Sequence, residues 1–261
     1  MSVKVAVQGA LGQMGQQVIK AVAEAKDLEL SGGCDAKATE GFLSINGNTI
    51  FLSSNLETCL DKTKPDVIVD FSLASAVPQT AETAARAGVS LVIGTTGLSP
   101  QVLARLEELT HEYNIGIMVA PNFALGAVVM MELARTASKY LDWAEIIELH
   151  HEKKADAPSG TAIATARMMQ AARDVPFESP KDEADYKSRG EEFYGVPIHS
   201  IRLPGLVAHQ EVIFGALGQT LSIRHDSISR ESFMPGVLLA VREIAKRRGQ
   251  FIFGLNKLLG F

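Results

Sequence analysis

The chain has 261 residues, of which 46% are apolar and 21% charged, and its formal net charge is −5. This composition is typical of a globular protein with a large core, and the negative balance argues against nucleic acid as the main partner, because neutralising phosphates takes clustered Lys and Arg. The sequence has no apolar run of about eighteen residues, and its two cysteines, Cys34 and Cys59, lack the spacing of a metal site. We therefore expect a cytoplasmic protein with no metal, no membrane partner and no nucleic-acid partner.

Short apolar runs alternate with amphipathic segments in the first part of the chain. The runs typical of buried strands are 3–8, 28–34, 66–71, 90–94 and 115–120. Helical spacing is found at 12–25 and 75–87, and Ser99 with Pro100 opens a third helix as its N-cap and first turn. The stretch up to Pro65 is expected to be irregular, with turn signals at 46–48. Repeated alternation of continuously apolar strands with helices predicts a parallel sheet covered on both faces.

A glycine-rich segment, GALGQMG from Gly9 to Gly15, lies between the first strand and the first helix. Glycines at this point permit a tight turn and the close approach of a pyrophosphate, which would rest on the helix N-terminus. The spacing GxxGxxG is less common than GxGxxG, so glycines that only shape a turn are an alternative. Asp35 ends the second strand, where a carboxylate would accept hydrogen bonds from an adenosine ribose, whereas Lys37 would suit a 2′-phosphate.

Three further strand ends carry small or polar residues. They are Asp70-Phe71-Ser72, Gly94-Thr95-Thr96-Gly97 and Ala120-Pro121-Asn122-Phe123. Each of them alone is compatible with ordinary turn chemistry. Ligands of open α/β sheets bind outside the carboxyl ends of the strands. Together the three ends therefore favour a site for a ribose and a nicotinamide carboxamide.

The second part of the chain predicts a different sheet. Helices are expected at 125–141, 161–172 and 229–247, with Pro235 as an alternative start of the last helix, which packs back on the first part. Strands are expected at 144–150, 196–202, 207–214 and 219–225. The strands fit an antiparallel or mixed sheet with one face available for covering. Residues 176–196 are polar and broken by prolines, which predicts a long loop and leaves open whether it is a mobile lid.

The segment HHEKKADAPSGTA, from His150 to Ala162, combines two imidazoles with two lysines and a small-residue turn. Imidazoles exchange protons near neutral pH, and Ser159 and its successors open a helix whose first N–H groups can hold an anion. The segment therefore predicts a carboxylate site beside a proton-transfer group, and the alternative is a solvated charged loop. Metal ligation is discounted, because adjacent strand residues point to opposite faces and no ligand set is completed.

Taken in order, these motifs resemble the 4-hydroxy-tetrahydrodipicolinate reductase family, also called dihydrodipicolinate reductases. The family pattern H-H-x-x-K-x-D-A-P-S-G-T-A is matched without a gap by residues 150–162. The resemblance implies NAD(P)H-dependent reduction of 4-hydroxy-tetrahydrodipicolinate (dihydrodipicolinate), a small cyclic dicarboxylate, to tetrahydrodipicolinate in lysine and diaminopimelate biosynthesis. It also implies an α/β fold: a Rossmann-type parallel sheet domain plus a smaller α+β domain with a mixed sheet, assembled as a homotetramer. We expect a dinucleotide-binding domain at 1–124 and 233–261, and a substrate-binding and oligomerisation domain at 125–232.

The same resemblance assigns roles to residues. His150 would donate or accept the proton, Lys154 would be the second catalytic residue, and His151, Gly160 and Thr161 would bind the substrate. The implied cofactor contacts are Gly9, Ala10, Leu11, Gly12, Gln13, Met14, Asp35, Gly94, Thr95, Thr96, Ala120, Pro121, Asn122 and Phe123. Ala36 and Lys37 depart from the family pattern and leave the choice between NADH and NADPH open, with Lys37 as a further cofactor contact. Asp156 is expected to hold the loop or cap the helix.

Two other functions remain alternatives. One is another Rossmann-fold NAD(P)-dependent oxidoreductase acting on an amino acid or an aldehyde, which would not require the segment 150–162. The other is a non-catalytic dinucleotide-sensing protein, which would use the glycine-rich loop and Asp35 but not His150 and Lys154. A panel of substrates with NADH oxidation separates these functions from the first.

Overall fold

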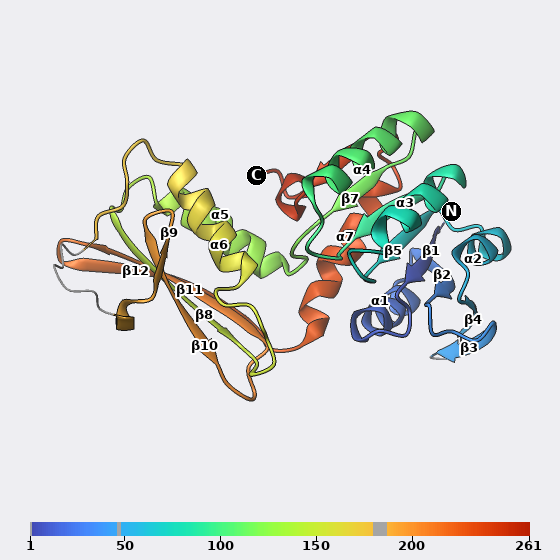
Figure 1. Cartoon of the computed structure of the whole chain (residues 1–261), viewed down its shortest axis with the longest axis horizontal. Helices are drawn as coiled ribbons and strands as arrows, with labels where there is room; N and C mark the ends of the chain where they lie inside the picture. The colour runs from blue at the N-terminus through green and yellow to red at the C-terminus, as the bar shows by residue number, and fades with distance from the viewer. Residues whose placement is uncertain (1, 46–47, 180–186) are drawn as a thin grey trace. The chain divides into compact units, whose positions relative to one another are not determined.

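The computed structural model describes residues 2–45, 48–179 and 187–261, and the chain divides into two compact units (Figure 1). Unit 1 comprises residues 1–123 and 233–261, and unit 2 comprises residues 124–232. Each unit has its own sheet and its own buried core. In the part of the chain that the structure describes, no helix is long and apolar enough to cross a membrane.

Unit 1 is built on an eight-stranded sheet with the order β13-β7-β6-β5-β1-β2-β4-β3, in which only the pair β3–β4 is antiparallel. Its strands are β1 (Val3–Gln8), β2 (Leu28–Cys34), β3 (Gly41–Ile45), β4 (Asn48–Ser53), β5 (Val67–Asp70), β6 (Ser90–Ile93), β7 (Ile117–Val119) and β13 (Phe251–Phe253). Its helices are α1 (Gln13–Glu24), α2 (Leu56–Thr63), α3 (Val77–Arg86), α4 (Pro100–Tyr113) and α7 (Met234–Ile244), with a 3-10 turn η3 (Leu255–Leu258).

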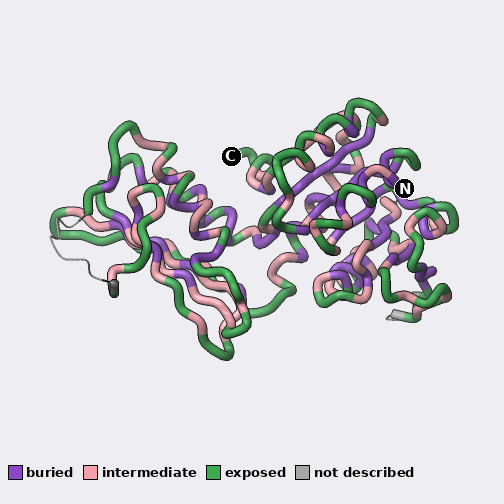
Figure 2. Tube along the Cα trace, in the orientation of Figure 1, coloured by how far each residue is buried: buried purple, intermediate pink, exposed green. Residues whose placement is uncertain are grey.

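The core of unit 1 lies on both faces of this sheet. Ala6, Ile68 and Leu91 pack in one cluster with helices α2, α3 and α4. Val69 and Val92 alternate with them along the strands, are equally buried and point to the opposite face, where α1 and α7 pack together. Figure 2 shows this concentration of buried residues in the central strands. The predicted parallel sheet covered on both faces is confirmed.

Two features of unit 1 differ from the sequence prediction. The stretch expected to be irregular contains the hairpin β3–β4, whose Phe42 and Phe51 rings meet edge to face at 5.8 Å, and also the helix α2. That helix begins where the Asn55 side chain accepts a hydrogen bond from the Thr58 N–H at 2.9 Å. The strand β13 was not predicted, because three residues give no periodic signal and the strand exists through its pairing with β7. The turn predicted at 46–48 falls largely outside the described residues.

Unit 2 has a five-stranded mixed sheet with the order β12-β11-β8-β10-β9, as the sequence predicted. Only β8 and β10 are parallel neighbours. The strands are β8 (Trp143–His150), β9 (Glu191–Phe193), β10 (Val196–Arg202), β11 (Ala208–Ala216) and β12 (Gln219–Ser227). The helices α5 (Leu125–Ala137) and α6 (Gly160–Ala171) pack together, and their apolar residues share a core with Ile146, Ile198 and Val212 on one face of the sheet.

Two predictions for the second part of the chain need correction. Residues 176–196 are not loop throughout, since they contain the 3-10 turn η1 (Lys187–Arg189) and β9, and residues 180–186 lie outside the described residues. The strand β9 forms because Tyr194 and Gly195 both have positive φ, 53° and 77°, which closes a tight hairpin onto β10. The final helix does not span 229–247, because a 3-10 turn η2 (Arg230–Phe233) precedes α7 and the helix ends at Ile244. Its start at Met234, with a proline in the first turn, agrees with the alternative start at Pro235.

Candidate active site

The glycine-rich loop of unit 1 is formed by close backbone contacts. Gly9 has a φ of +79°, and a Cβ built on Gly15 would lie 2.0 Å from the Gly9 carbonyl oxygen. The N–H groups of Gly9 and Ala10 donate to the Cys34 carbonyl at 2.8 and 3.1 Å, which fixes the loop to β2. Helix α1 then begins after the exposed Gly12, with no side-chain cap among the described residues. Its first N–H groups are therefore placed for an anion, so the loop fits a pyrophosphate.

Asp35 holds this loop through its carboxylate. One oxygen, Oδ2, accepts from the Leu11 N–H at 3.0 Å, and Oδ1 accepts from the Lys37 N–H at 3.0 Å. Each oxygen keeps a second lone pair for a ligand hydroxyl. The Lys37 residue itself is exposed.

The three polar strand ends of unit 1 come together at the same edge of the sheet as the glycine-rich loop. A Cβ on Gly9 would lie 2.8 Å from the Phe71 carbonyl oxygen, and one on Gly94 would lie 2.1 Å from the Phe71 ring. The rings of Phe71 and Phe123 are 5.8 Å apart. Among the remaining predicted residues, Thr95 is buried, Asn122 is half-buried, Thr96 and Pro121 are exposed, and the Ala120 N–H donates to β6.

Asp70 is a buried carboxylate at this edge. Its Oδ1 accepts from the Ser72 N–H at 2.7 Å and from the Thr95 hydroxyl at 3.2 Å. Burial raises the pKa of Asp70, and the hydrogen bonds from Ser72 and Thr95 partly offset that effect. Asp70 therefore fixes two of the loops that follow the strands.

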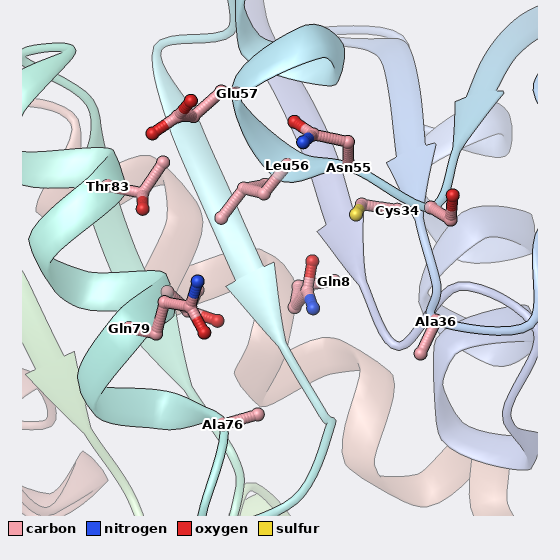
Figure 3. A pocket seen from close by; sticks show the side chains of 11 residues that line it. Gln8, Cys34, Ala36, Asn55, Leu56, Glu57, Ala76, Gln79 and Thr83 are labelled. Carbon is pink, nitrogen blue, oxygen red and sulfur yellow. The ribbon is translucent and has the colours of Figure 1, made fainter.

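A pocket of about 270 Å³ opens beside Asp35 and was not foreseen from the sequence (Figure 3). Its lining comes from the ends of β1 and β2 and from α2 and α3: Gln8, Cys34, Ala36, Ser54, Asn55, Leu56, Glu57, Ala76, Gln79, Thr80 and Thr83. Burial raises the pKa of the Cys34 thiol to about 12, so this group is not a nucleophile near neutral pH. The N-cap residue Asn55 was the available signal for the missed helix α2.

In unit 2, His150 ends strand β8 and is joined to Glu148. The imidazole Nδ1 lies 2.5 Å from Glu148 Oε2, because residues two apart on a strand share a face. Arg202 is paired with His150 in the sheet register and donates to both carboxylate oxygens of Glu148, at 2.9 and 2.8 Å. The carboxylate also accepts from the Ser159 N–H at 3.2 Å.

Glu148 is fully buried and ionised. Burial on its own would raise its pKa, but the hydrogen bonds from His150 and Arg202 outweigh this effect and lower the pKa of Glu148 to about 2. An ionised carboxylate only accepts hydrogen bonds. The His150 Nδ1 is therefore the protonated ring nitrogen, and Nε2 is the nitrogen that remains for another partner.

Lys154 and Asp156 form a close ion pair in the loop that follows. The Lys154 ammonium donates to both carboxylate oxygens of Asp156, at 2.7 and 2.8 Å, and this hydrogen bonding lowers the pKa of Asp156. The Asp156 carbonyl accepts from Arg202 at 2.7 Å, and the Lys154 N–H donates to the carbonyl of the half-buried His151 at 3.1 Å. The loop is thereby tied to the His150–Glu148 pair.

The start of α6 completes the cluster. The Ser159 hydroxyl accepts from the Ala162 N–H at 3.2 Å and caps the helix. The Gly160 Cα faces open space, since nothing lies within 4 Å of a Cβ built there. The N–H groups of Gly160 and Thr161 are thus at a helix start that suits a carboxylate. The structure brings His150, Lys154 and this helix start together.

Glu148 and Arg202 are the residues of this cluster that the sequence prediction missed. Glu148 was detectable from its place two residues before His150 on a strand. Arg202 was not, because its contact depends on the register of two strands 54 residues apart. Within the described ranges, no group of three or more His, Cys, Asp or Glu residues is placed to hold a metal ion.

Unit 1 combines a doubly wound parallel sheet with a glycine-rich helix start. Unit 2 of the same chain combines an imidazole–carboxylate pair with a helix start that suits an anion. Together these features define the class of Rossmann-type oxidoreductases. Family models described as the N-terminus and the C-terminus of dihydrodipicolinate reductase match residues 3–123 and 126–259. The chain belongs to the dihydrodipicolinate reductase family, which confirms the resemblance in the sequence.

Individual relatives are similar to this chain over almost its whole length. A 4-hydroxy-tetrahydrodipicolinate reductase of Dehalococcoides mccartyi is 50% identical over 259 residues, which cover 98% of each chain. One of Moorella thermoacetica is 43% identical over 265 residues, covering 100% of this chain and 99% of the relative. A solved structure, dipicolinate-bound dihydrodipicolinate reductase from Paenisporosarcina sp. TG-14, has a TM-score of 0.86 at 35% identity and covers 98% of this chain and 99% of its own.

Proposed function

We propose that the protein is a 4-hydroxy-tetrahydrodipicolinate reductase, which uses NADH or NADPH to reduce this cyclic dicarboxylate to tetrahydrodipicolinate in lysine and diaminopimelate biosynthesis. The observation that carries the proposal is the cluster at the end of β8, where His150, Lys154 and the start of α6 come together in a chain whose relatives bear this name. A proton-transfer group beside cations and N–H donors is what the reduction of a dicarboxylate requires.

Unit 1 would hold the cofactor. The start of α1 would bind the pyrophosphate, the oxygens of Asp35 would accept from the adenosine ribose, and the pocket between α2 and α3 would take the adenine. The strand ends at Gly94–Thr96 and Ala120–Phe123 would contact the nicotinamide end. When bound, the nicotinamide supplies the electron pair as a hydride. Lys37 is exposed two residues from Asp35, so we expect both NADH and NADPH to be accepted.

Unit 2 would hold the substrate. Lys154, His151 and the N–H groups of Gly160 and Thr161 would bind its carboxylates through charge-assisted hydrogen bonds. His150 would transfer a proton at Nε2, since its Nδ1 is committed to Glu148. Lys154 would also stabilise the negative charge that develops as the ring is reduced.

The mixed sheet supports a homotetramer. Side chains on its face opposite to α5 and α6 include the half-buried Ile147, Leu149 and Ile213 and the exposed Ile201, all of which a neighbouring copy would cover. Light scattering should give a mass about four times the 28.0 kDa of one chain, and Ile213→Glu should lower it. The two buried free cysteines support a reducing, cytoplasmic location.

The experiment that tests the function is oxidation of NADH and of NADPH by the purified protein with freshly generated 4-hydroxy-tetrahydrodipicolinate. Amino acids and aldehydes serve as control substrates in the same assay. The proposal requires oxidation that depends on the cyclic dicarboxylate with at least one cofactor. Oxidation with a control substrate only would assign the chain to another oxidoreductase activity, and cofactor binding without turnover would indicate a sensor.

A further inference from the structure

We infer that Glu148 is a positioning residue for the reaction. It fixes which ring nitrogen of His150 carries a proton, and it links His150 to the helix start where the substrate carboxylate would bind. The inference rests on the proposed function. Glu148 is fully buried, so it acts through its neighbours and not on the substrate. Its partners come from three elements: His150 on β8, Arg202 on β10 and Ser159 at the N-cap of α6.

The stability of the fold does not explain a carboxylate at this position. Ala144 and Ile146 precede Glu148 on the same face of β8 and are buried in an apolar core. A buried ion pair is often no more stabilising than apolar side chains of similar volume, because both charges lose their hydration. An aliphatic residue at position 148 would therefore serve the core, whereas only an acceptor serves His150.

The first consequence concerns the tautomer of His150. With Glu148 ionised, the Nδ1–H group of the imidazole donates to Oε2, and the exchangeable proton is the one at Nε2. Arg202 donates to both carboxylate oxygens and keeps Glu148 ionised while sharing its charge.

The second consequence concerns distance. Glu148 uses Oε2 for His150 and Oε1 for the Ser159 N–H, so one rigid group connects the proton-transfer residue with the beginning of α6. A carboxylate bound at Gly160 and Thr161 would then be held in a fixed position relative to Nε2. Positioning of this kind can raise a rate by several orders of magnitude, because the reacting groups are already held in the reactive geometry.

In the described part of the chain, the charged groups that adjoin Glu148 are paired with other groups. The loop contributes the Lys154–Asp156 pair, and β10 contributes Arg202. In the row of paired residues across the sheet, β11 contributes the uncharged Gln210 and β12 contributes His225, two strands away. The buried residues of α6 are Ala162, Thr165, Ala166 and Met169, none of which titrates.

The chain offers a matched control on the opposite face of the same strand. Glu145 lies 2.8 Å from the His199 Nε2 and accepts from Arg189 at 2.8 Å, so it too is paired with a histidine and an arginine. It is half-exposed, and its histidine is not part of the site. Glu145→Gln and Glu148→Gln make the same chemical change on the two faces of β8.

The test measures kcat and KM for the two variants, with NADH affinity by fluorescence titration. For Glu148→Gln we expect kcat to fall by about 10²- to 10⁴-fold, with NADH affinity unchanged. The loss should appear in kcat, with a much smaller change in KM for the dicarboxylate, because Glu148 is buried and does not touch the substrate. Glu145→Gln should match the wild type in kcat and in KM, and it should have the same oligomeric state.

Two outcomes would overturn the inference. One is a Glu148→Gln variant with normal kcat, and the other is an equal loss of kcat in both variants. If Glu148→Gln does not fold, the double variant Glu148→Gln with Arg202→Met removes both charges of the Glu148–Arg202 pair, and it should fold with low kcat. A folded double variant with wild-type kcat would also overturn the inference. Failure of the proposed function would be distinct, since the wild type itself would then not turn over the dicarboxylate.

Discussion

Lys154 is held by Asp156 through two hydrogen bonds, from its ammonium Nζ to both carboxylate oxygens at 2.7 and 2.8 Å. The lysine side chain is 21% exposed and that of the aspartate 59%. The cation proposed to bind the substrate therefore already has a counter-ion, and the pair is connected to Glu148 through Arg202. A substrate carboxylate would have to share or replace Asp156 as the partner of Lys154.

Lys154→Ala should lower kcat/KM for the dicarboxylate by about 10²-fold, because a positioned cation stabilises negative charge that develops during reduction. The exposed neighbour Lys153 is the control, and Lys153→Ala should behave as wild type. Both variants should bind NADH normally. Steady-state kinetics of the two variants measures both values of kcat/KM. A low kcat/KM for Lys153→Ala with a nearly normal value for Lys154→Ala would assign the role to Lys153 and contradict this prediction.

Asp156→Asn should lower KM for the dicarboxylate, since it removes a negative charge that competes with the substrate for Lys154. An exposed ion pair of this kind is worth about 1 kcal/mol at most, so the change should be about fivefold or less. The dependence of KM on salt should become steeper as well. A KM that rises in this variant would show that Asp156 positions Lys154 and does not compete for it.

Lys37→Ala should shift the cofactor preference toward NADH. The ammonium attracts a 2′-phosphate, whereas Asp35 repels it and bonds ribose hydroxyls. In the structure Asp35 is anchored by the N–H groups of Leu11 and Lys37, and the substitution preserves both contacts because they involve the backbone. Calorimetry with NADH and NADPH measures the ratio of the two affinities. An unchanged ratio would mean that Lys37 points away from the ribose.

His225 should make the stability of the protein depend on pH. Its ring packs against α5, since a Cβ on Gly126 would lie 2.5 Å from its Cδ2, and burial lowers the pKa of His225 below 6.5. The unfolded chain then binds the proton more readily, so the stabilisation is complete above about pH 6.5 and is lost as the pH falls through the lower folded value. Urea unfolding between about pH 8 and pH 5 should show a shallower loss for His225→Gln. Parallel curves for the two proteins would contradict this account.

Sequence patterns predicted the fold wherever an element carries its own signal. The central strands β5 and β6 are continuously apolar and buried, and Ser99 caps α4 as predicted. The hairpin β3–β4 was missed because its strand β3 lies at the edge of the sheet, where an exposed side chain such as Phe42 weakens the apolar pattern. The strand β13 was missed because it depends on pairing with a distant partner.

The residues of the candidate site also differ in whether the local sequence predicts them. The glycine-rich loop and the segment from His150 to Thr161 are local motifs, and both could be identified from the sequence. The Glu148–Arg202 contact joins residues 54 positions apart, and it required the parallel register of β8 and β10. The pocket beside Asp35 required the helix α2, which the sequence prediction had left as irregular chain.

The measurement that tests the central claim most directly is turnover of 4-hydroxy-tetrahydrodipicolinate by the wild type and by His150→Gln, with NADH affinity measured in parallel. We predict turnover that depends on this substrate in the wild type and a fall of about 10²-fold or more in the variant, because a proton-transfer group is lost while no cofactor contact changes. NADH affinity should be the same in both proteins. Equal turnover by the two proteins would contradict the role of His150, and an absence of turnover in the wild type would contradict the proposed function itself.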